Sequence, residues 1–148
     1  AALCQPIAKV MQRLGSDRVL VVHAQDGLDE ISLATPTQIA ELKNGSVSEY
    51  SISPEELGVA SQSLIGLTVD SAAQSLELIK DALGSQLTPA AKKAADMLAL
   101  NAGAALYVCG VADSIKAGVA LAQSTIKSGA ALAKINALKE KTQTYNNA

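Results

Sequence analysis

The hydrophobic residues near the N-terminus follow two patterns in succession. The first recurs at intervals of three and four residues, the spacing of one helix face, and comprises Ile7, Val10, Met11 and Leu14. Pro6 suits the first turn of this helix and Gly15 suits its end. The second pattern is a continuous aliphatic run at residues 18–24, which predicts a strand covered on both faces. A helix followed by a buried strand is half of an α/β unit.

Residues 38–52 have the pattern of two extended segments joined by a tight turn. The dipeptide Asn44-Gly45 tolerates the positive φ angles of a type I′ turn, so we predict a β-hairpin here. A two-residue turn places two favourable pairs on opposite strands, namely Leu42 with Val47 and Ile39 with Tyr50. The hairpin therefore has a predicted register as well as a predicted turn.

The next two segments are predicted to be helical. In "SPEELG", Ser53 suits the cap of one short helical turn. From residue 71 onward, apolar residues are spaced by four, three and four positions, which predicts a helix with one apolar face made of Ala72, Leu76, Ile79 and Leu83. Gly84 suits the end of this helix.

The rest of the chain also has the pattern of helices. Thr88 suits a cap and Pro89 the first position of a helix that ends near Gly110. A further helix at about residues 113–127 presents one apolar face, formed by Ile115, Val119, Ala122 and Ile126. A last segment runs to about Lys141, and we expect the tail "TQTYNNA" to be frayed.

These patterns together predict an α/β fold. The strands, including a hairpin, lie in the N-terminal half, and Ala-rich helices make up the C-terminal half. The chain has 148 residues, which suits one domain with a real core. Because it contains no Phe and no Trp, the core must be built from Ala, Leu, Ile and Val, which favours close packing of helices.

Composition and charge weigh against several classes of protein. The net charge of −2, with no basic block and only three aromatic residues, disfavours nucleic-acid binding. Cys4 and Cys109 lie far apart and suit reduced thiols in a cytosolic protein. Residues 97–112 carry no charge, but the run is shorter than a membrane span of roughly 20 residues, so a buried core helix is the better interpretation. No Gly-rich phosphate loop of either common type is present.

Three acids lie in the loop "HAQDGLDEIS" that follows the predicted strand. Gly27 permits a sharp turn there, after which Asp29 and Glu30 are adjacent acids at a strand end. Two neighbouring carboxylates suit a hard divalent cation that shares its other positions with water and phosphate oxygens, as magnesium does. The alternative is a solvated pair without a ligand. We expect His23 to be an ordinary strand-end residue and Asn101 to form a hydrogen bond within the core.

Three stretches resemble the anthranilate phosphoribosyltransferase family of tryptophan biosynthesis. They are residues 14–58, which contain "DGLDEIS" and "PEELG", then "LALNAGAALYVCG" and "GVALAQSTIKSGAAL". Their order and spacing agree with the C-terminal part of the family over nearly the whole chain. The resemblance implies part of a nucleoside-phosphorylase and phosphoribosyltransferase-like α/β domain.

The resemblance also implies a function. The family's acids in this loop bind magnesium, which carries over onto Asp29 and Glu30. The implied enzyme is a cytoplasmic, magnesium-dependent glycosyltransferase that transfers a phosphoribosyl group from phosphoribosyl pyrophosphate to the amine of anthranilate and releases pyrophosphate. The expected partners are these two substrates and a second copy of the full-length protein, with no nucleic acid and no membrane.

Family order further implies that residues 1–148 are the C-terminal part of a single α/β catalytic domain. The Gly-rich pyrophosphate loop, the anthranilate-binding residues and the N-terminal helical subdomain would precede Ala1. We therefore expect no catalytic residue in this chain, only the metal-binding pair, and no turnover from the chain alone. Two alternatives remain: a pyrimidine-nucleoside phosphorylase-like enzyme, and a non-catalytic α/β binding or scaffold module.

Overall fold

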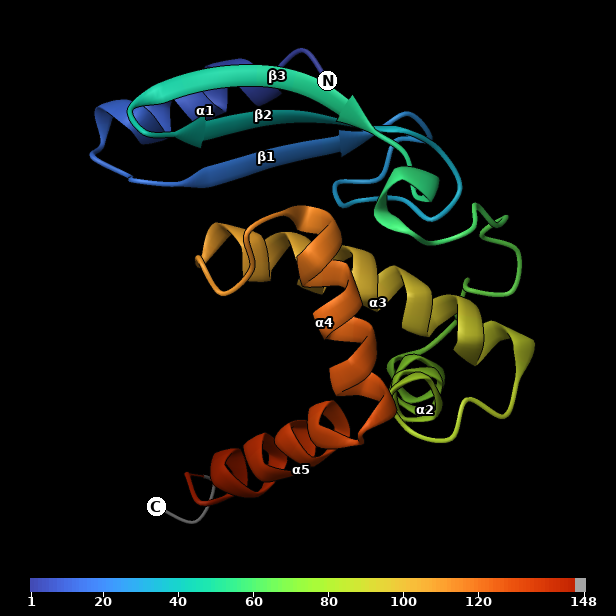
Figure 1. Ribbon diagram of the computed structural model, residues 1–148. Coiled ribbons are helices and arrows are strands. Elements are labelled where there is room, and N and C mark those ends of the chain that lie inside the picture. The colour runs from blue at the N-terminus through green and yellow to red at the C-terminus, as the bar shows by residue number, and fades with distance from the viewer. Residues whose placement is uncertain (146–148) are drawn as a thin grey trace.

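The computed structural model describes residues 1–145 and has the predicted α/β organisation, with the strands in the N-terminal half and helices in the C-terminal half. A three-stranded sheet lies at one end of the molecule, with α3 and α4 next to it and α2 and α5 farther away (Figure 1). The elements are α1 (Cys4–Arg13), β1 (Val19–Ala24), β2 (Thr37–Lys43), β3 (Ser46–Ile52), the 3-10 turn η1 (Glu55–Leu57), α2 (Ala72–Leu83), α3 (Pro89–Val108), α4 (Ile115–Lys127) and α5 (Ala130–Gln143).

The hairpin of β2 and β3 has the predicted turn and the predicted register. Asn44 and Gly45 have φ angles of 51° and 73°, as a type I′ turn requires. Both predicted pairs face each other across the two strands, Leu42 with Val47 and Ile39 with Tyr50. The sheet is antiparallel throughout, in the order β1-β2-β3, so β2 is its central strand.

The two faces of the sheet pack against different helices, because side chains of a strand alternate between its faces. On one face, Ala40 packs with Cys4 and Ala8 of α1, and Val21 and Val47 lie beside them. On the other face, Ile39 belongs to the main core that α3 and α4 help to form. The sheet is therefore a layer between α1 and the C-terminal helices.

The predicted first helix is confirmed, but its apolar face is not the face that packs on the sheet. Ile7, Val10 and Leu14 are 45%, 53% and 75% exposed, whereas Cys4 and Ala8 are buried against the sheet. Small side chains let α1 approach the strands closely, so the face with the larger apolar residues points away from them. Periodicity identifies an apolar stripe on a helix but does not identify which element covers it.

The first strand is covered on both faces, as predicted, because Val21 packs beside α1 and Leu20 and Val22 pack against the main core, but the coverage is incomplete. Only Ala24 of β1 is fully buried, and the other residues of this strand are half-buried. The reason is that β1 lies at the edge of the described sheet, whereas most of β2 is buried. An aliphatic run does not reveal whether its strand will be central or peripheral.

The short turn after the hairpin is present, but its cap differs from the prediction. The cap position of η1 is Pro54, which makes no side-chain cap hydrogen bond. Ser53 instead donates from its backbone N–H and its hydroxyl to a carboxylate oxygen of Glu56, at 2.6 Å and 3.0 Å. The glutamate thus reaches back to the serine, as it does in half of a capping box.

The C-terminal helices begin and end near their predicted positions. The hydroxyl of Thr88 accepts a hydrogen bond from the N–H of Ala91 at 3.1 Å, and Pro89 occupies the first turn of α3. The predicted buried face of α4, from Ile115 to Ile126, is confirmed. Helix α5 continues to Gln143, two residues past the predicted end, and the last three residues of the predicted tail lie outside the described residues.

The long uncharged segment lies mainly in α3, which supplies much of the core, including Leu100 and Tyr107. The predicted close packing of helices occurs where α3 crosses α4, at Gly103 and Gly118. None of the described helices combines the length and apolar composition that crossing a membrane requires.

Candidate functional site

The loop between β1 and β2, residues 25–36, carries the predicted metal-binding acids and is closed by its own hydrogen bonds. At its base, the N–H of Gln25 donates to the carbonyl oxygen of Pro36 at 3.0 Å. Gly27 has a φ of 93°, a conformation that favours glycine, so the predicted sharp turn is confirmed. The loop is therefore a defined turn at the end of β1.

Asp26, the first of the three acids, is used by the loop itself. Its carboxylate accepts hydrogen bonds from the hydroxyl of Ser32 at 2.6 Å and from the N–H of Leu28 at 3.4 Å. Its own N–H donates to the hydroxyl of Thr35 at 3.3 Å. Because these bonds cross-link the two sides of the loop, Asp26 holds the turn together, a role that its sequence position alone did not reveal.

Asp29 and Glu30 have a different environment. Both are exposed, and neither carboxylate accepts a hydrogen bond from any other residue in the range 1–145. Glu30 also lines a shallow cavity of about 290 Å³ whose other lining residues are Leu28, Leu64, Leu67, Thr68 and Met97. Partial burial, and then the charge of Asp29, raise the pKa of the Glu30 carboxyl above its ordinary value. Two free and mutually repelling acids are thus held side by side.

This pair fits a divalent cation that takes most of its ligands from elsewhere. No group of three or more His, Cys, Asp or Glu residues is gathered anywhere in the described part of the chain. A cation held in an all-protein cage would need such a group. Magnesium usually keeps several waters and binds through one or two carboxylates plus phosphate oxygens, so Asp29 and Glu30 are sufficient protein ligands for it.

The predicted hydrogen bonding of Asn101 is confirmed, and its partner is the acid-bearing loop. The side-chain oxygen of Asn101 accepts from the N–H of Ile31 at 2.8 Å. Its side-chain nitrogen donates to the carbonyl oxygens of Ile31 and Met97, at 2.9 Å and 3.1 Å. Helix α3 therefore holds the residue that directly follows Glu30.

His23 lies on β1, half-buried, opposite Gln38. Its imidazole makes no hydrogen bond with another described residue and belongs to no cluster of metal-ligating side chains among residues 1–145. The expectation of an ordinary strand residue therefore fits its position in the structure.

A second polar network joins β2 to α3 and was not predicted from the sequence. Glu41, only 9% exposed, accepts hydrogen bonds from the hydroxyls of Tyr107 and Tyr50 at 2.7 Å and 2.9 Å. Lys43 donates to the Tyr107 hydroxyl at 2.9 Å, and the guanidinium of Arg18 lies 4.6 Å from the centre of the same ring. These groups satisfy one another, so the network stabilises the packing of the sheet on α3.

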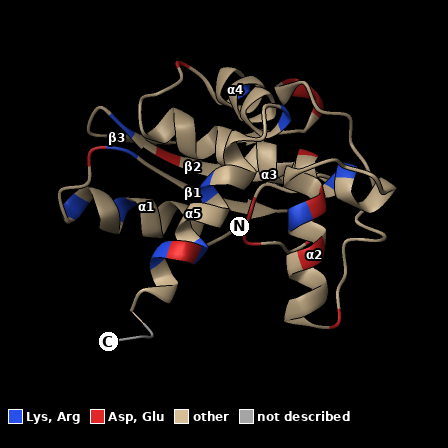
Figure 2. Ribbon diagram, turned by 90° about the horizontal axis from the view of Figure 1, so that it is seen from below, with Lys and Arg blue, Asp and Glu red and all other residues tan. Residues whose placement is uncertain are grey.

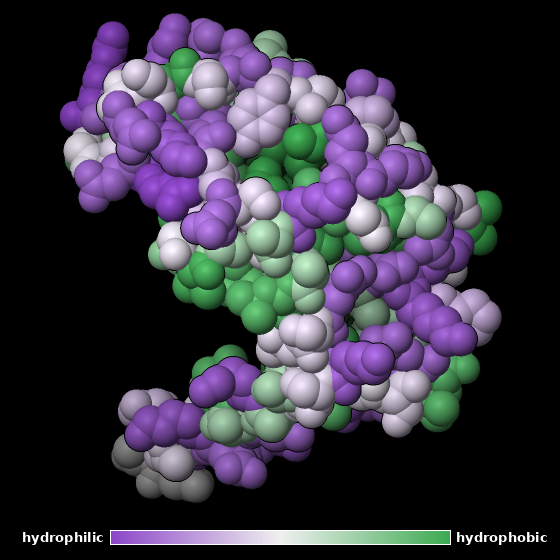
Figure 3. Space-filling view, viewed as in Figure 1, coloured by the Kyte–Doolittle hydropathy of each residue, from purple (hydrophilic) through white to green (hydrophobic). Residues whose placement is uncertain are grey.

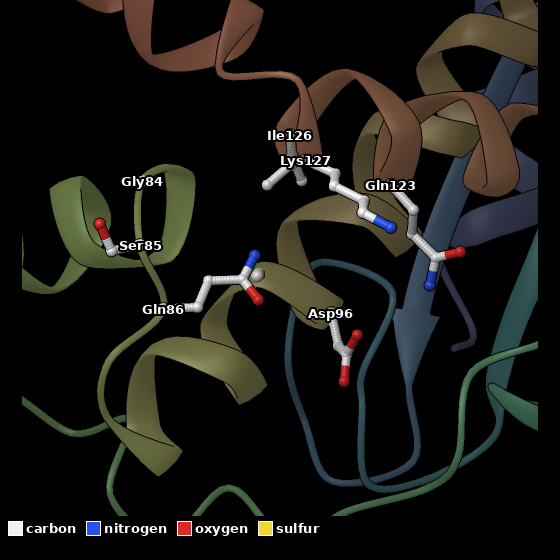
Figure 4. Close-up of a pocket in the computed structure, with 8 residues that line it drawn as sticks. Gly84, Ser85, Gln86, Asp96, Gln123, Ile126 and Lys127 are labelled. Atoms are coloured by element: carbon white, nitrogen blue, oxygen red, sulfur yellow. The ribbon is translucent and has the colours of Figure 1, made fainter.

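A larger cavity, of about 410 Å³, lies among α3, α4 and the segment after α2 (Figure 4). Its polar lining includes Gln86, Asp96, Gln123 and Lys127. Asp96 accepts a hydrogen bond from the side chain of Gln62 at 2.8 Å. In Figure 2, the lysines, arginines and acids are distributed over several helices, strands and loops and do not gather in one place. The acid pair of the β1–β2 loop therefore carries the clearest chemical signal.

The chain is similar to proteins named anthranilate phosphoribosyltransferase. An anthranilate phosphoribosyltransferase of Ectopseudomonas mendocina is 60% identical over 144 residues, which cover 97% of this chain and 41% of that protein. A protein of the same name from Cellvibrio japonicus is 58% identical over 141 residues, which cover 95% of this chain and 41% of that protein. The chain thus spans well under half the length of these relatives.

Solved structures give the same result. The crystal structure of anthranilate phosphoribosyltransferase from Thermus thermophilus matches with a TM-score of 0.75 and 33% identity, over 86% of this chain and 36% of that one. The Saccharomyces cerevisiae enzyme in complex with PRPP and Mg shares the fold, with a TM-score of 0.77 and 18% identity, over 90% of this chain and 38% of that one. The family model described as "Glycosyl transferase family, a/b domain" matches residues 1–132, and the chain therefore belongs to this glycosyl transferase family.

Proposed function

We propose that the chain is part of a magnesium-dependent anthranilate phosphoribosyltransferase. Such an enzyme transfers the phosphoribosyl group of phosphoribosyl pyrophosphate to the amine of anthranilate and releases pyrophosphate. The observation that carries the proposal is the 60% identity to a relative of that name, which extends over 97% of this chain. The exposed pair Asp29 and Glu30, without other partners in residues 1–145, gives the proposal a physical site.

The role proposed for this pair is electrostatic. When bound, magnesium neutralises the negative charge that accumulates on the departing pyrophosphate. Asp29 and Glu30 would hold the ion at the end of β1, and no proton transfer by either acid is needed. Because the amine of anthranilate needs little activation, positioning of the two substrates supplies much of the remaining rate acceleration.

We further propose that residues 1–148 form the C-terminal part of the α/β catalytic domain of a longer, cytoplasmic, homodimeric protein. Support comes from large apolar side chains that α1 exposes, Leu3, Ile7, Val10 and Leu14. A second support is the apolar groove of about 410 Å³ between β1 and α3, lined by residues such as Leu20 and Val108. In Figure 3, further apolar surface gathers over α3 and α4, above the hollow beside α5. In the intact protein, these surfaces would be covered by the remainder of the chain.

The test uses the full-length protein and its variants D29N, E30Q and the double variant. The proposal expects wild-type protein to consume anthranilate, measured by the loss of its fluorescence, only when phosphoribosyl pyrophosphate and magnesium are both present. Each variant should lower turnover by at least 10-fold, the scale set by removal of a group that stabilises developing charge. Q25E, which changes charge in the same loop and leaves both acids in place, is the control and should retain turnover.

Wild-type turnover that needs neither phosphoribosyl pyrophosphate nor magnesium would contradict the proposal. A protein with no turnover at all, whose stability and ligand binding are unchanged in the double variant, would support the scaffold alternative. The isolated chain of residues 1–148 is a separate case. It holds only the metal-binding pair and should show no turnover, which the same fluorescence measurement checks.

A further inference from the structure

Both polar atoms of the Asn101 carboxamide form hydrogen bonds with backbone groups. Its oxygen accepts from the N–H of Ile31 at 2.8 Å, while its nitrogen donates to the carbonyl oxygens of Ile31 at 2.9 Å and of Met97 at 3.1 Å. The N–H and the carbonyl oxygen of Ile31 are therefore both hydrogen-bonded to the Asn101 side chain. Seventy residues separate the two partners in the sequence.

The helix that carries Asn101 is a rigid support. Leu100, next to it, is fully buried, and Gly103 lies in direct contact with the backbone of α4 at Val119. Ile31 is itself only 2% exposed, so its side chain is anchored in the core as well. The hydrogen bonds thus connect the acid-bearing loop to the most tightly packed part of the molecule.

The acid pair needs such a support. Asp29 and Glu30 carry like charges, are exposed, and receive no hydrogen bond from the rest of residues 1–145. Adjacent like charges repel each other, and an unrestrained loop would relax by separating them. Asp26 cross-links the loop through Ser32. Asn101 is the contact that fixes the residue directly after Glu30 to a helix.

The residue type also needs an explanation. Asn101 is a polar residue in a helix segment that packs into an apolar core, where an unsatisfied amide is costly. Leucine or alanine would suit packing alone. An aspartate could accept from the N–H of Ile31 but, when ionised, could not donate to its carbonyl oxygen. Only a carboxamide of this length makes both bonds to one peptide residue here.

We propose that Asn101 is a positioning residue for the metal-binding pair: by clamping the backbone of Ile31, it holds Glu30, and with it Asp29, in the arrangement that receives the magnesium ion. The inference rests on the proposed function and adds to it a residue outside the loop. Groups behind a metal ligand orient that ligand, and their loss commonly weakens metal affinity by 10–100-fold.

The experiment compares N101A, N101D and V119A in the full-length protein. Val119 is fully buried on α4 where that helix meets Gly103 of α3, so V119A destabilises the core without removing any hydrogen bond of the clamp. The readout is the magnesium concentration that gives half of the thermal stabilisation by phosphoribosyl pyrophosphate, a binding measurement that requires no turnover. N101A should raise this concentration about 10-fold, and N101D less, because aspartate keeps one bond. V119A should leave it within about 2-fold, although the unfolding temperature falls.

The inference would be overturned if N101A raised the half-stabilising magnesium concentration no more than V119A does. The amide of Ile31 in wild-type protein gives a second measurement that does not depend on any variant folding. The clamp requires this amide to be protected from hydrogen exchange before magnesium is added, and rapid exchange would overturn the inference as well.

The variants D29N and E30Q separate this inference from the proposed function. If they raise the half-stabilising magnesium concentration and N101A does not, the metal site stands and the clamp fails. If they leave it unchanged, the proposed metal site itself fails.

Discussion

Gly103 and Gly118 lie against each other where α3 crosses α4. A Cβ atom built on Gly118 would overlap the carbonyl oxygen of Gly103, and one built on Gly103 would overlap the backbone nitrogen of Val119. Neither backbone can move away easily, because both helices are packed into the core. The two glycines therefore set how closely the helices approach.

From this contact we predict that G103A and G118A each lower the free energy of unfolding by about 3 kcal/mol or more, at or beyond the upper end for overpacking a core. Denaturant unfolding monitored by circular dichroism measures the change. G129A is the control: its added Cβ would meet nothing within 4 Å, although φ is 78°. It should cost only about 1 kcal/mol, from its left-handed backbone. Equal effects at all three positions would contradict the packing explanation.

The raised pKa of Glu30 predicts a conflict between stability and metal binding. Burial and the charge of Asp29 disfavour the ionised carboxylate in the folded protein. The stability that Glu30 contributes is therefore present below its ordinary pKa of 4.5 and is lost as the pH rises through the higher folded value. E30Q should consequently stabilise the metal-free protein at pH 7 while weakening magnesium binding.

Free energies of unfolding measured from pH 4 to pH 7 test this prediction. The advantage of E30Q over wild type should grow with pH across that range. E140Q, at an exposed acid of α5, provides a control for general charge removal. A variant E30Q that is less stable than wild type at pH 7 would show that the carboxylate is not strained.

Tyr107 makes the hydrogen bond at the centre of the network between β2 and α3. Y107F removes a donor to the buried carboxylate of Glu41 and the acceptor for Lys43, while it preserves the packing of the ring. We expect a loss of about 1–3 kcal/mol, the cost of leaving one oxygen of a buried carboxylate without its donor, while Tyr50 still donates to the other oxygen. Denaturant unfolding again gives the value. Y145F, at a residue that is 68% exposed, should change stability little.

Asp81 connects the end of α2 to the start of α3. Its carboxylate accepts from the N–H of Leu87 at 2.9 Å and from the hydroxyl of Thr88 at 3.0 Å, and these bonds lower its pKa. The stability that these hydrogen bonds contribute is present above the ordinary pKa of the Asp81 carboxyl and is lost as the pH falls through its lower value in the folded protein. D81N should therefore be less stable than wild type at pH 7, and the difference should shrink as the pH falls below the ordinary pKa of the Asp81 carboxyl.

Unfolding curves at several acidic pH values measure the effect of D81N. E77Q is the matched control on α2, because Glu77 pairs only with Lys80 at the surface. Such a pair contributes little stability. A difference between D81N and wild type that persists unchanged at pH 2 would exclude the proposed hydrogen bonds as its cause.

Local sequence signals predicted the elements of this fold well. Asn44-Gly45 determined both the turn and the register of the hairpin, because a two-residue loop leaves no freedom in pairing. Thr88 and Pro89 located the start of α3, since capping depends on neighbours along the chain. The acid pair was likewise visible as a pattern, although its binding of magnesium stays a prediction.

The sequence was silent where distant contacts decide the outcome. The larger apolar residues of α1 form one face of the helix, but the sheet packs against the small side chains of Cys4 and Ala8. The aliphatic composition of β1 could not show that the strand lies at an edge. The sequence indicated that Asn101 would be hydrogen-bonded, but nothing near it in the chain pointed to Ile31 as its partner.

The distance along the chain between Asn101 and Ile31 has a consequence for the order of folding. The acid-bearing turn is synthesised seventy residues before the helix that secures it. Contacts of such long range form late, because closing a long segment of chain is entropically costly. We therefore expect the turn to acquire its final geometry only after α3 has docked beside the sheet, so that a magnesium ion is received by a finished fold rather than recruited to nucleate one.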